Sequence, residues 1–405
     1  MLICSVILLH QVIQDANAES RIDKDILENA IHKSAAYLTK KCQSDGKFVY
    51  CINIDGRYKP PKSYNVLRHA GAIYALSMYA DWALNDKVDN AIKSSSGFLK
   101  KRCIGPVPYK KNMFAVWSDP ELTFQRSPLL AKLGGSGLGM LALSRHEKRF
   151  KTGEFNKELA GLKTFIEYLQ KDNGLFYSKY IPTAGGKDNS FESLYYPGEA
   201  CMGLMSYYQV SKDPGCIAIV EKALKGLADK REGQDNVEAD HWALLATAQL
   251  LKCSDYKEKI ISKAKLISHA EQICKSILKG SAEFPASSPF YGSSEKDGRI
   301  CPTATRLEGL LAAMTFLDKS GILYQEIKQR SGAGIHFLLR VQRKDIPYEG
   351  AFTRAAFRLN QRHKSHSIAF NMKAFEVRID YVQHALSALI MYHRLFYSEN
   401  SIKKK

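Results

Sequence analysis

The feature that most constrains this chain is a regular alternation of two kinds of helical segment. In the first kind, apolar residues recur every three or four positions beside charged ones, which is typical of a helix with one face in solvent. In the second kind, Ala, Gly, Leu and Tyr predominate and charge is nearly absent after the first turn, which is typical of a helix buried on all sides. The amphipathic segments are 27–38, 88–99, 159–169, 220–227, 264–277 and 324–338, and the buried ones are 64–79, 133–143, 195–208, 240–251, 303–317 and 378–392.

The two kinds of segment alternate six times, so one helix pair recurs with a period of about 60 residues. An array of helix pairs either stacks openly or closes on itself, and six pairs close well. Several amphipathic segments also end in a related glycine turn, at Gly46, at Gly174 and more loosely at Gly280, where glycine suits the left-handed end of a helix. We therefore expect one all-α domain over residues 19–405, with six helical hairpins arranged as an inner and an outer ring of helices.

This pattern resembles the (α/α)6 toroid superfamily, which includes six-hairpin glycosidases, polysaccharide lyases and sugar epimerases. The resemblance covers nearly all of the chain after residue 18. It lies in the architecture and the repeat, and no family-specific catalytic signature accompanies it. The resemblance implies a toroid with a polar cavity at one end and an enzyme that acts on carbohydrates.

The N-terminus has the features of a signal peptide. An apolar run from Leu2 to Leu9 precedes Ala16-Asn17-Ala18, which matches a cleavage site of the A-x-A type before Glu19. No Lys or Arg precedes the apolar run, so a buried first helix is the alternative. No later segment has the roughly 18 uncharged apolar residues that cross a bilayer. We expect a signal peptide at 1–18 and a periplasmic or secreted protein without a transmembrane segment.

Removing Cys4 with the signal peptide leaves eight of the nine cysteines, an even number in a compartment that permits disulfides. Cys42 and Cys51 flank a glycine-containing turn and are the best candidate pair. Most of the others lie in apolar helical runs, where a buried thiol is the commoner explanation. No C-x-x-C occurs, so the sequence supports neither a zinc ribbon nor a thioredoxin-type site.

The net charge of +18 favours anionic partners such as acidic polysaccharides, membrane surfaces or nucleic acids. The basic residues are scattered, and no helix-turn-helix, zinc-finger or RNA-binding pattern accompanies them, so we expect no nucleic-acid partner. An anionic polysaccharide or oligosaccharide is the expected partner, with cell-envelope association as a further option. The long connection at 343–377 carries several Arg and Lys residues, and we expect a basic insertion loop that covers the cavity mouth.

Each buried segment begins with polar or ionisable residues. If the six buried helices run parallel, their first turns open at one end of the ring, where helix N-termini favour anions. The catalytic candidates there are Glu199, Asp240, Glu308, Asp380, Tyr381, His384 and His69, and the substrate-binding candidates are Tyr64, Arg68, Tyr195, Tyr196, His241, Arg306 and Arg378.

Glu199 is the most informative of these residues, because Pro197-Gly198 fixes the start of its helix and places the carboxylate among apolar residues. Such a carboxyl has a raised pKa and suits general acid catalysis, and the structural alternative is an ion pair with an arginine. Asp240 could equally be a helix N-cap. A lone histidine one turn into a helix, such as His69, is more often a core residue than a catalyst.

Two kinds of chemistry stay open. Glu199 with Asp240, Glu308 or Asp380 as second carboxylate would suit hydrolysis of a glycosidic bond. Tyr381, His384 and His69 beside the arginines would suit proton abstraction next to a uronate, as in a lyase or C5-epimerase, because arginine neutralises the carboxylate.

We expect no metal and no cofactor. A site made of Asp240, His241, Asp380 and His384 is unfavourable because adjacent helical residues such as Asp240 and His241 diverge by about 100°. The alternative to an enzyme is a non-catalytic module that binds an anionic cell-envelope polysaccharide. In that case, each candidate carboxylate should be fully engaged by arginine.

Overall fold

The computed structural model describes residues 22–360 and 364–398. The predicted signal peptide at 1–18 lies outside these ranges. The described part of the chain contains fourteen α-helices, α2 to α15, and seven short strands. None of these helices has both the length and the apolar character needed to cross a bilayer.

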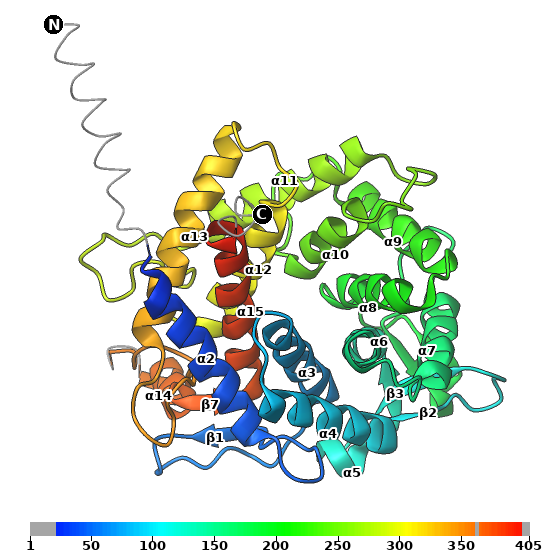
Figure 1. Ribbon diagram of the computed structural model, residues 1–405, viewed down its shortest axis with the longest axis horizontal. Coiled ribbons are helices and arrows are strands. Elements are labelled where there is room, and N and C mark those ends of the chain that lie inside the picture. Colours follow the sequence, from blue (N-terminus) through cyan, green and yellow to red (C-terminus); the bar gives the residue numbers. More distant parts are fainter. Residues whose placement is uncertain (1–21, 361–363, 399–405) are drawn as a thin grey trace, which may run out of the picture.

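Twelve helices form two concentric rings (Figure 1). The outer helices are α2 (Lys24–Lys41), α4 (Asp86–Cys103), α7 (Asn156–Leu169), α9 (Gly215–Arg231), α11 (Lys263–Gly280) and α13 (Ile322–Val341). The inner helices are α3 (Val66–Ala80), α6 (Leu133–Phe150), α8 (Tyr196–Ser211), α10 (His241–Leu251), α12 (Ile300–Ala313) and α15 (Ile379–Phe396). Each inner helix contacts the next, and α15 contacts α3, so the ring is closed. The predicted (α/α)6 toroid is confirmed.

The burial of the two rings follows the sequence pattern. Every residue of inner helix α3 except Arg68 is buried. Outer helix α11 instead buries one face, with Leu266, Ala270, Ile273 and Ile277 at helical spacing. The absence of charge in the inner segments therefore reflects helices that are surrounded by other helices.

Glycines allow α6 and α8 to pack closely. A Cβ atom on Gly137 would lie 2.6 Å from the Cα of Ala200, and one on Gly203 would lie 2.3 Å from the carbonyl oxygen of Gly137. The glycine-rich run at 134–137 therefore serves helix packing.

Glycine turns also fasten outer helices to one another. Four glycines in such turns have φ between 82° and 86°, and a Cβ atom on each would lie within 2.1 Å of a backbone oxygen of another outer helix. The turns at Gly46 and Gly174 are as predicted, but the third follows α11 at Gly292 and not at Gly280. The contacts join Gly46 to Ser94 of α4, Gly174 to Lys222 of α9, Gly292 to Ala333 of α13, and Gly350 to Lys33 of α2.

The seven strands and the two short helices outside the rings were not predicted. A five-stranded antiparallel sheet has the order β2 (Ile104–Pro106), β3 (Phe114–Ser118), β4 (Leu130–Lys132), β5 (Lys179–Ile181), β6 (Gly186–Asp188), and α5 (Pro120–Thr123) follows β3. A second antiparallel pair joins β1 (Cys51–Asn53) to β7 (Glu376–Arg378), which places Arg378 at the start of α15.

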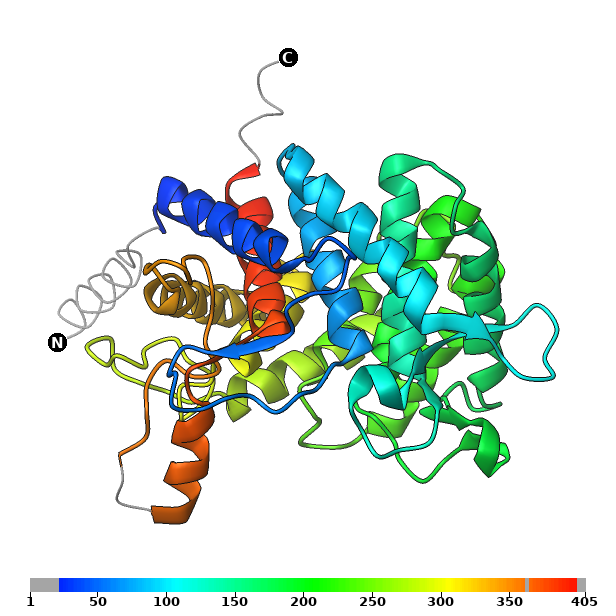
Figure 2. The same ribbon diagram turned by 90° about the horizontal axis from the view of Figure 1, so that it is seen from below.

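The segment 343–377 is more ordered than the predicted loop, since it contains α14 (Lys364–Lys373), which projects from the ring (Figure 2). The backbone of segment 343–377 forms a hydrogen bond with the start of α12, where the amide of Ile300 donates to the carbonyl of Arg354 at 3.0 Å. Arg358 also forms an ion pair with Asp55. This segment therefore packs against 51–58 and 298–300.

The predicted Cys42–Cys51 disulfide is wrong, because all eight cysteines in the described ranges are free. The Cys42 thiol lies 3.8 Å from the carbonyl oxygen of Ala91 on α4, whereas Cys51 begins the strand that pairs with Arg378. The glycine turn at Gly46 folds back on the outer ring and separates the two thiols.

Candidate active site

A cavity of about 400 Å³ opens where the inner helices begin, and all six inner helices contribute to its lining. We call it the N-end pocket. The candidate residues that line it are Arg68, Tyr195, Tyr196, Glu199, His241, Arg306, Arg378, Asp380 and His384. Within the described ranges, segment 343–377 contributes no lining residue, so the predicted position of that segment over the pocket is not observed.

Tyr64 and His69 do not line the pocket, which corrects the expectation for both. His69 is fully buried, with its Nδ1 2.7 Å from the Tyr64 hydroxyl and its Nε2 2.9 Å from the carbonyl oxygen of Ser95. Burial lowers the pKa of His69 to about 4, so it is neutral. Because Arg68 faces the pocket, the adjacent His69 points outward toward α4.

Asp240 and Tyr381 also lie outside the pocket. Asp240 is fully buried, accepts a bond of 2.7 Å from Nη2 of Arg231, and caps α10 by accepting from the amide of Ala243 at 3.0 Å. Tyr381 is buried under the guanidinium of Arg378, which lies 4.5 Å from the ring centroid. Both residues are structural, and in each case a helical neighbour faces the pocket.

Two histidines of the pocket wall, from α10 and α15, meet a predicted glutamate, Glu308 of α12, that lies behind the wall and does not line the pocket. Nδ1 of His384 on α15 lies 2.7 Å from Oε2 of Glu308 on α12, and Glu308 is buried behind it. His241 on α10 places its Nε2 4.0 Å from the same oxygen, and neither of its ring nitrogens has a hydrogen-bond partner among the described residues. The two imidazole rings are 5.7 Å apart and nearly perpendicular.

The surroundings move the pKa values of these two histidines in opposite directions. Burial disfavours the charged form of His384, but the charge and hydrogen bond of Glu308 outweigh it and raise the pKa. For His241, burial lowers the pKa well below its usual value, and the charge of His384 lowers it further. The environment therefore favours the protonated form of His384 and the neutral form of His241 beside it, an arrangement that suits acid–base catalysis.

Glu199 is a third titratable group in the pocket. Burial raises its pKa to about 8, with a smaller contribution from Asp240, so its carboxyl is protonated at neutral pH. Its Oε2 has no hydrogen-bond partner among the described residues. A Cβ atom on Gly134 would lie 1.9 Å from this oxygen, so only glycine at 134 leaves room for the carboxyl group.

The arginines of the pocket hold carboxylates. Arg378 donates to both oxygens of Asp380, at 2.6 and 2.9 Å, and Nε of Arg68 lies 3.0 Å from the same carboxylate. Burial opposes ionisation of Asp380, but Arg68 and Arg378 outweigh it and lower the pKa. Arg306 pairs with Glu295 at 2.6 Å. Two arginines thus share one carboxylate, which leaves this side of the pocket with excess positive charge.

Several lining residues were not predicted. Cys301 and Pro302 were missed because α12 begins at Ile300, three residues before the expected start. Gln383 is next to the predicted residue His384. It also lines the pocket because a wide part of the surface of α15 faces the cavity. The remaining unpredicted lining residues are Asn65, Leu67, Leu138, Ala239, Trp242 and Thr305.

One group of side chains could hold a metal ion. One ligand atom each from His241, Glu308 and His384 lies within 4.8 Å of the other two, and two imidazoles with a carboxylate suit Zn²⁺. This set differs from the four residues considered from the sequence, since Asp240 faces Arg231 and Asp380 binds arginines. A metal ion here would replace the hydrogen bond between Glu308 and His384.

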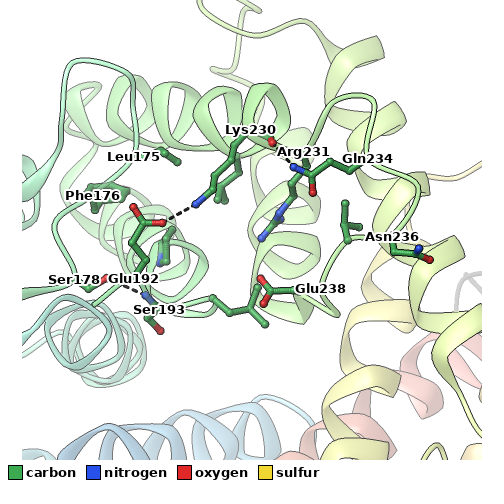
Figure 3. A pocket seen from close by; sticks show the side chains of 14 residues that line it. Leu175, Phe176, Ser178, Glu192, Ser193, Lys230, Arg231, Gln234, Asn236 and Glu238 are labelled. Carbon is green, nitrogen blue, oxygen red and sulfur yellow. Dashed lines mark hydrogen bonds and ion pairs between the residues drawn. The ribbon is translucent and has the colours of Figure 1, made fainter. Parts of the chain in front are cut away.

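A second cavity of about 340 Å³ lies beside the N-end pocket, between the turns that precede α8 and α10. Figure 3 shows Lys230 bonded to Glu192 across it and Arg231 in its wall. Because Arg231 holds Asp240, the buried ion pair separates this cavity from the N-end pocket.

Together, the fold and the pocket define an (α/α)6 toroid with an axial cavity at the N-terminal ends of its inner helices. Titratable side chains with shifted pKa values line this cavity. No protein-family model matches the sequence, and a search of curated proteins gives no match. Solved structures are similar over nearly the whole chain. A cellobiose 2-epimerase from Bacillus thermoamylovorans B4167 has a TM-score of 0.63 and 11% identity, covering 90% of this chain and 98% of that one.

Two further structures give the same picture. A D-mannose isomerase has a TM-score of 0.61 at 13% identity and covers 91% of this chain and 98% of its own. An unsaturated glucuronyl hydrolase specific for heparin has a TM-score of 0.60 at 12% identity, with 92% and 98% covered. At these identities the similarity establishes the toroid fold, and the reaction must be argued from the pocket.

Proposed function

We propose that this protein is an enzyme that moves a proton on a sugar, at a carbon next to a carbonyl or carboxyl group. The observation that carries the proposal is a pair of imidazoles in one pocket whose pKa values move in opposite directions. Glu308 raises the pKa of His384, and burial lowers the pKa of His241. Isomerisation, epimerisation and β-elimination all begin when one group accepts a proton from carbon while an acid stabilises the negative charge that develops on oxygen. The proton then returns to the opposite face of the same carbon in epimerisation, to the neighbouring carbon in isomerisation, or to the departing oxygen in β-elimination.

The proposed roles follow from the protonation states. Neutral His241, whose ring nitrogens have no hydrogen-bond partner in the described part of the chain, accepts the proton from the sugar carbon. His384, whose protonated form Glu308 favours and orients, donates a proton to the substrate oxygen that develops negative charge. Glu199 is protonated at neutral pH and serves as a further hydrogen-bond donor or acid.

We further propose that the substrate carries an anionic group. Among the described residues, Asp380 is the one carboxylate that Arg68 and Arg378 contact, and Arg68 also donates to the hydroxyl of Tyr50. Their remaining N–H groups and the N-termini of the inner helices favour a carboxylate at this wall. The heparin-specific glucuronyl hydrolase among the similar structures acts on an acidic sugar, as its name states, whereas the isomerase and the epimerase are named for neutral ones. Export remains part of the proposal, on the basis of the N-terminal sequence.

Hydrolysis and pure binding have less support. Hydrolysis by two carboxylates requires a second free carboxylate, yet Asp240, Asp380 and Glu308 are held by Arg231, by two arginines and by His384. Pure binding predicts that every carboxylate is engaged by arginine. Glu199 is not, because its Oε2 lacks a partner among the described residues.

The test is incubation of the purified protein with neutral and acidic mono- and oligosaccharides in deuterium oxide. We expect deuterium incorporation at the carbon beside the carbonyl or carboxyl group, detected by NMR, together with an epimer, an isomer or an unsaturated uronate. New reducing ends without carbon-bound deuterium would contradict the proposal and favour hydrolysis.

Two controls sharpen this experiment. His384→Gln and His241→Gln should each abolish exchange while the circular dichroism spectrum stays native. Turnover of neutral sugars alone would reject the anionic substrate and leave the proton transfer in place. Loss of activity with a chelator and its recovery with Zn²⁺ would replace the acid–base roles with a metal site at His241, Glu308 and His384.

A further inference from the structure

A second axial cavity lies at the opposite end of the toroid, where the inner helices finish. Its volume is about 690 Å³, and every inner helix contributes to its lining. We call it the C-end cavity. The rings of Tyr74, in its wall, and Trp242, in the wall of the N-end pocket, are tilted by 45° with centroids 6.4 Å apart, so this aromatic pair lies between the two openings. None of the groups proposed for proton transfer lines it.

The charged residues of this cavity are predominantly basic. Two carboxylates are present, and both are already engaged. Asp81 lies 3.2 Å from Nη2 of Arg145, and Asp255 accepts the hydroxyl of Tyr208. The basic residues are Arg145, Lys148, Lys212, Lys252 and Arg394.

Four of these basic residues have no carboxylate partner among the described residues. The ammonium of Lys148 donates to the side-chain oxygen of Gln209 at 2.9 Å, and Arg394 donates to the carbonyl of Met78 at 3.1 Å. The buried Nε of Arg145 has no hydrogen-bond partner in the described structure. This cavity therefore holds strong donors that lack anionic acceptors.

The basic residues also repel one another. Burial lowers the pKa of Lys148, and Arg145, Lys252 and Arg394 lower it further, with Asp81 opposing them. The same causes, burial and then Arg145, lower the pKa of Arg394. Four of the basic residues, Lys148, Lys212, Lys252 and Arg394, are exposed at the mouth of the cavity, and methionine and leucine side chains form part of its wall.

Helix dipoles explain part of this arrangement. The C-terminal ends of helices favour cations, and Lys212 and Lys252 are the C-cap residues of α8 and α10. Lys148 and Arg394 lie in the last turns of α6 and α15, where the dipole also favours them. Arg145 precedes the last turn of α6, and its buried Nε has no hydrogen-bond partner among the described residues. Helix ends therefore account for four of the five basic residues, but they leave unexplained the unpartnered Nε of Arg145, whose charge acts on both Lys148 and Arg394.

We propose that the C-end cavity is a binding site for a compact anion with two or more negative charges, of the phosphate-ester or oligophosphate kind. Such a ligand accepts several N–H donors at once and offsets the repulsion among the basic residues. This site is separate from the proton-transfer pocket, and the proposal does not depend on the proposed function.

Isothermal titration of the full chain with pyrophosphate tests the proposal. We expect saturable binding that weakens as KCl is added. The double variant Lys148→Gln/Lys252→Gln should weaken binding by about tenfold or more, because two charged donors are lost. Lys148→Arg should keep most of the affinity. Lys40→Gln, which removes a lysine from the last turn of outer helix α2, is the matched control and should bind as the native chain does.

Three results would overturn the proposal. Pyrophosphate that does not bind at millimolar concentration would show that the basic residues only cap helices. Equal affinity in the native chain and a correctly folded double variant, judged by circular dichroism, would exclude this site. Binding lost in Arg306→Gln but kept in the double variant would place the anion in the N-end pocket.

Discussion

His384 on the last inner helix and Glu308 on the inner helix before it are joined by a hydrogen bond of 2.7 Å between Nδ1 and Oε2. A buried carboxylate in this position fixes the imidazole ring and directs its other nitrogen away from α12. A similar pair links His393 to Glu28 of α2 at 2.8 Å, outside the N-end pocket. Because only the first pair adjoins the pocket, variants of the two pairs distinguish the effect of such a bond on catalysis from its effect on stability.

Glu308→Gln should lower the pKa of His384, because the variant loses the carboxylate that raises it. The alkaline limb of the pH–rate profile should move to lower pH, and NMR titration of the imidazole should show the same shift. A folded-state pKa above the unfolded value contributes stability below about pH 6.5, which is lost as the pH rises through the folded value. The stability lost in Glu308→Gln should therefore be greatest in acid.

Glu28→Gln is the matched control for this experiment, since it breaks a carboxylate–histidine pair outside the pocket. It should leave the pH–rate profile unchanged. An unaltered His384 pKa in Glu308→Gln would contradict the proposed pairing.

Glu199→Gln should abolish turnover and leave folding intact, because glutamine has nearly the shape of the protonated carboxyl group. Since the pKa of Glu199 rises to about 8 in the folded protein, the native chain should lose stability as pH rises from about 4.5 toward 8. The variant should lack this loss and be the more stable protein at pH 8. Urea denaturation at pH 5 and pH 8 measures the difference, and a large drop in stability at pH 5 would show that Glu199 has a structural ion pair instead.

Gly134→Ala should reduce turnover strongly, because the new Cβ atom would lie 1.9 Å from the Glu199 carboxyl oxygen and 2.5 Å from Cδ1 of Tyr196. The carboxyl group must move, and the acid would no longer face the substrate. Gly97→Ala on outer helix α4 is the control, since its Cβ atom meets nothing within 4 Å. Measurement of kcat for both variants tests whether turnover depends on the position of the Glu199 carboxyl group. A native kcat in Gly134→Ala would show that Glu199 takes no part in the reaction.

Asp240→Asn should destabilise the fold by about 3 to 5 kcal/mol, because it leaves the buried guanidinium of Arg231 without a counter-charge. Thermal or urea unfolding measures the loss, and Asp25→Asn at the exposed start of α2 should cost much less. A variant of native stability but without turnover would restore Asp240 as a catalytic candidate.

The mature protein should begin at Glu19 if residues 1–18 are a signal peptide. Mass spectrometry of the protein from a cell-envelope or secreted fraction checks this expectation. Recovery of the chain with Met1 from the cytosol would contradict export.

The sequence predicted the ring better than it predicted the pocket. Apolar periodicity and uncharged segments were sufficient for the twelve major helices, because burial on one face or on all faces leaves different residue patterns. The seven strands have three to five residues each, too few for a period to be recognised. Two of the pairings also join strands far apart in the chain, as for Cys51 with Arg378 and Ala131 with Tyr180.

For the site, the residue types at the starts of the inner helices predicted which helices line the pocket. They did not always predict which side chain of a helix faces it. Arg68 and His69 both looked suitable, and only the rotation of α3 decided that Arg68 faces inward. The same rotation rule separates Asp380 from Tyr381. The role of Glu308 depended on its contact with His384 across two helices, 76 positions apart, which no local pattern contains.

The glycine turn at Gly350 lies against Lys33 of the first outer helix, so the end of the array is fastened to its beginning. A linear stack of repeats can lose a terminal unit and keep the rest, because each unit contacts only its neighbours. This ring has no terminal unit: deleting any hairpin would remove two interfaces and leave a gap that the others cannot close. The toroid should therefore unfold as a whole, and a shortened homologue would need a different curvature at every remaining joint.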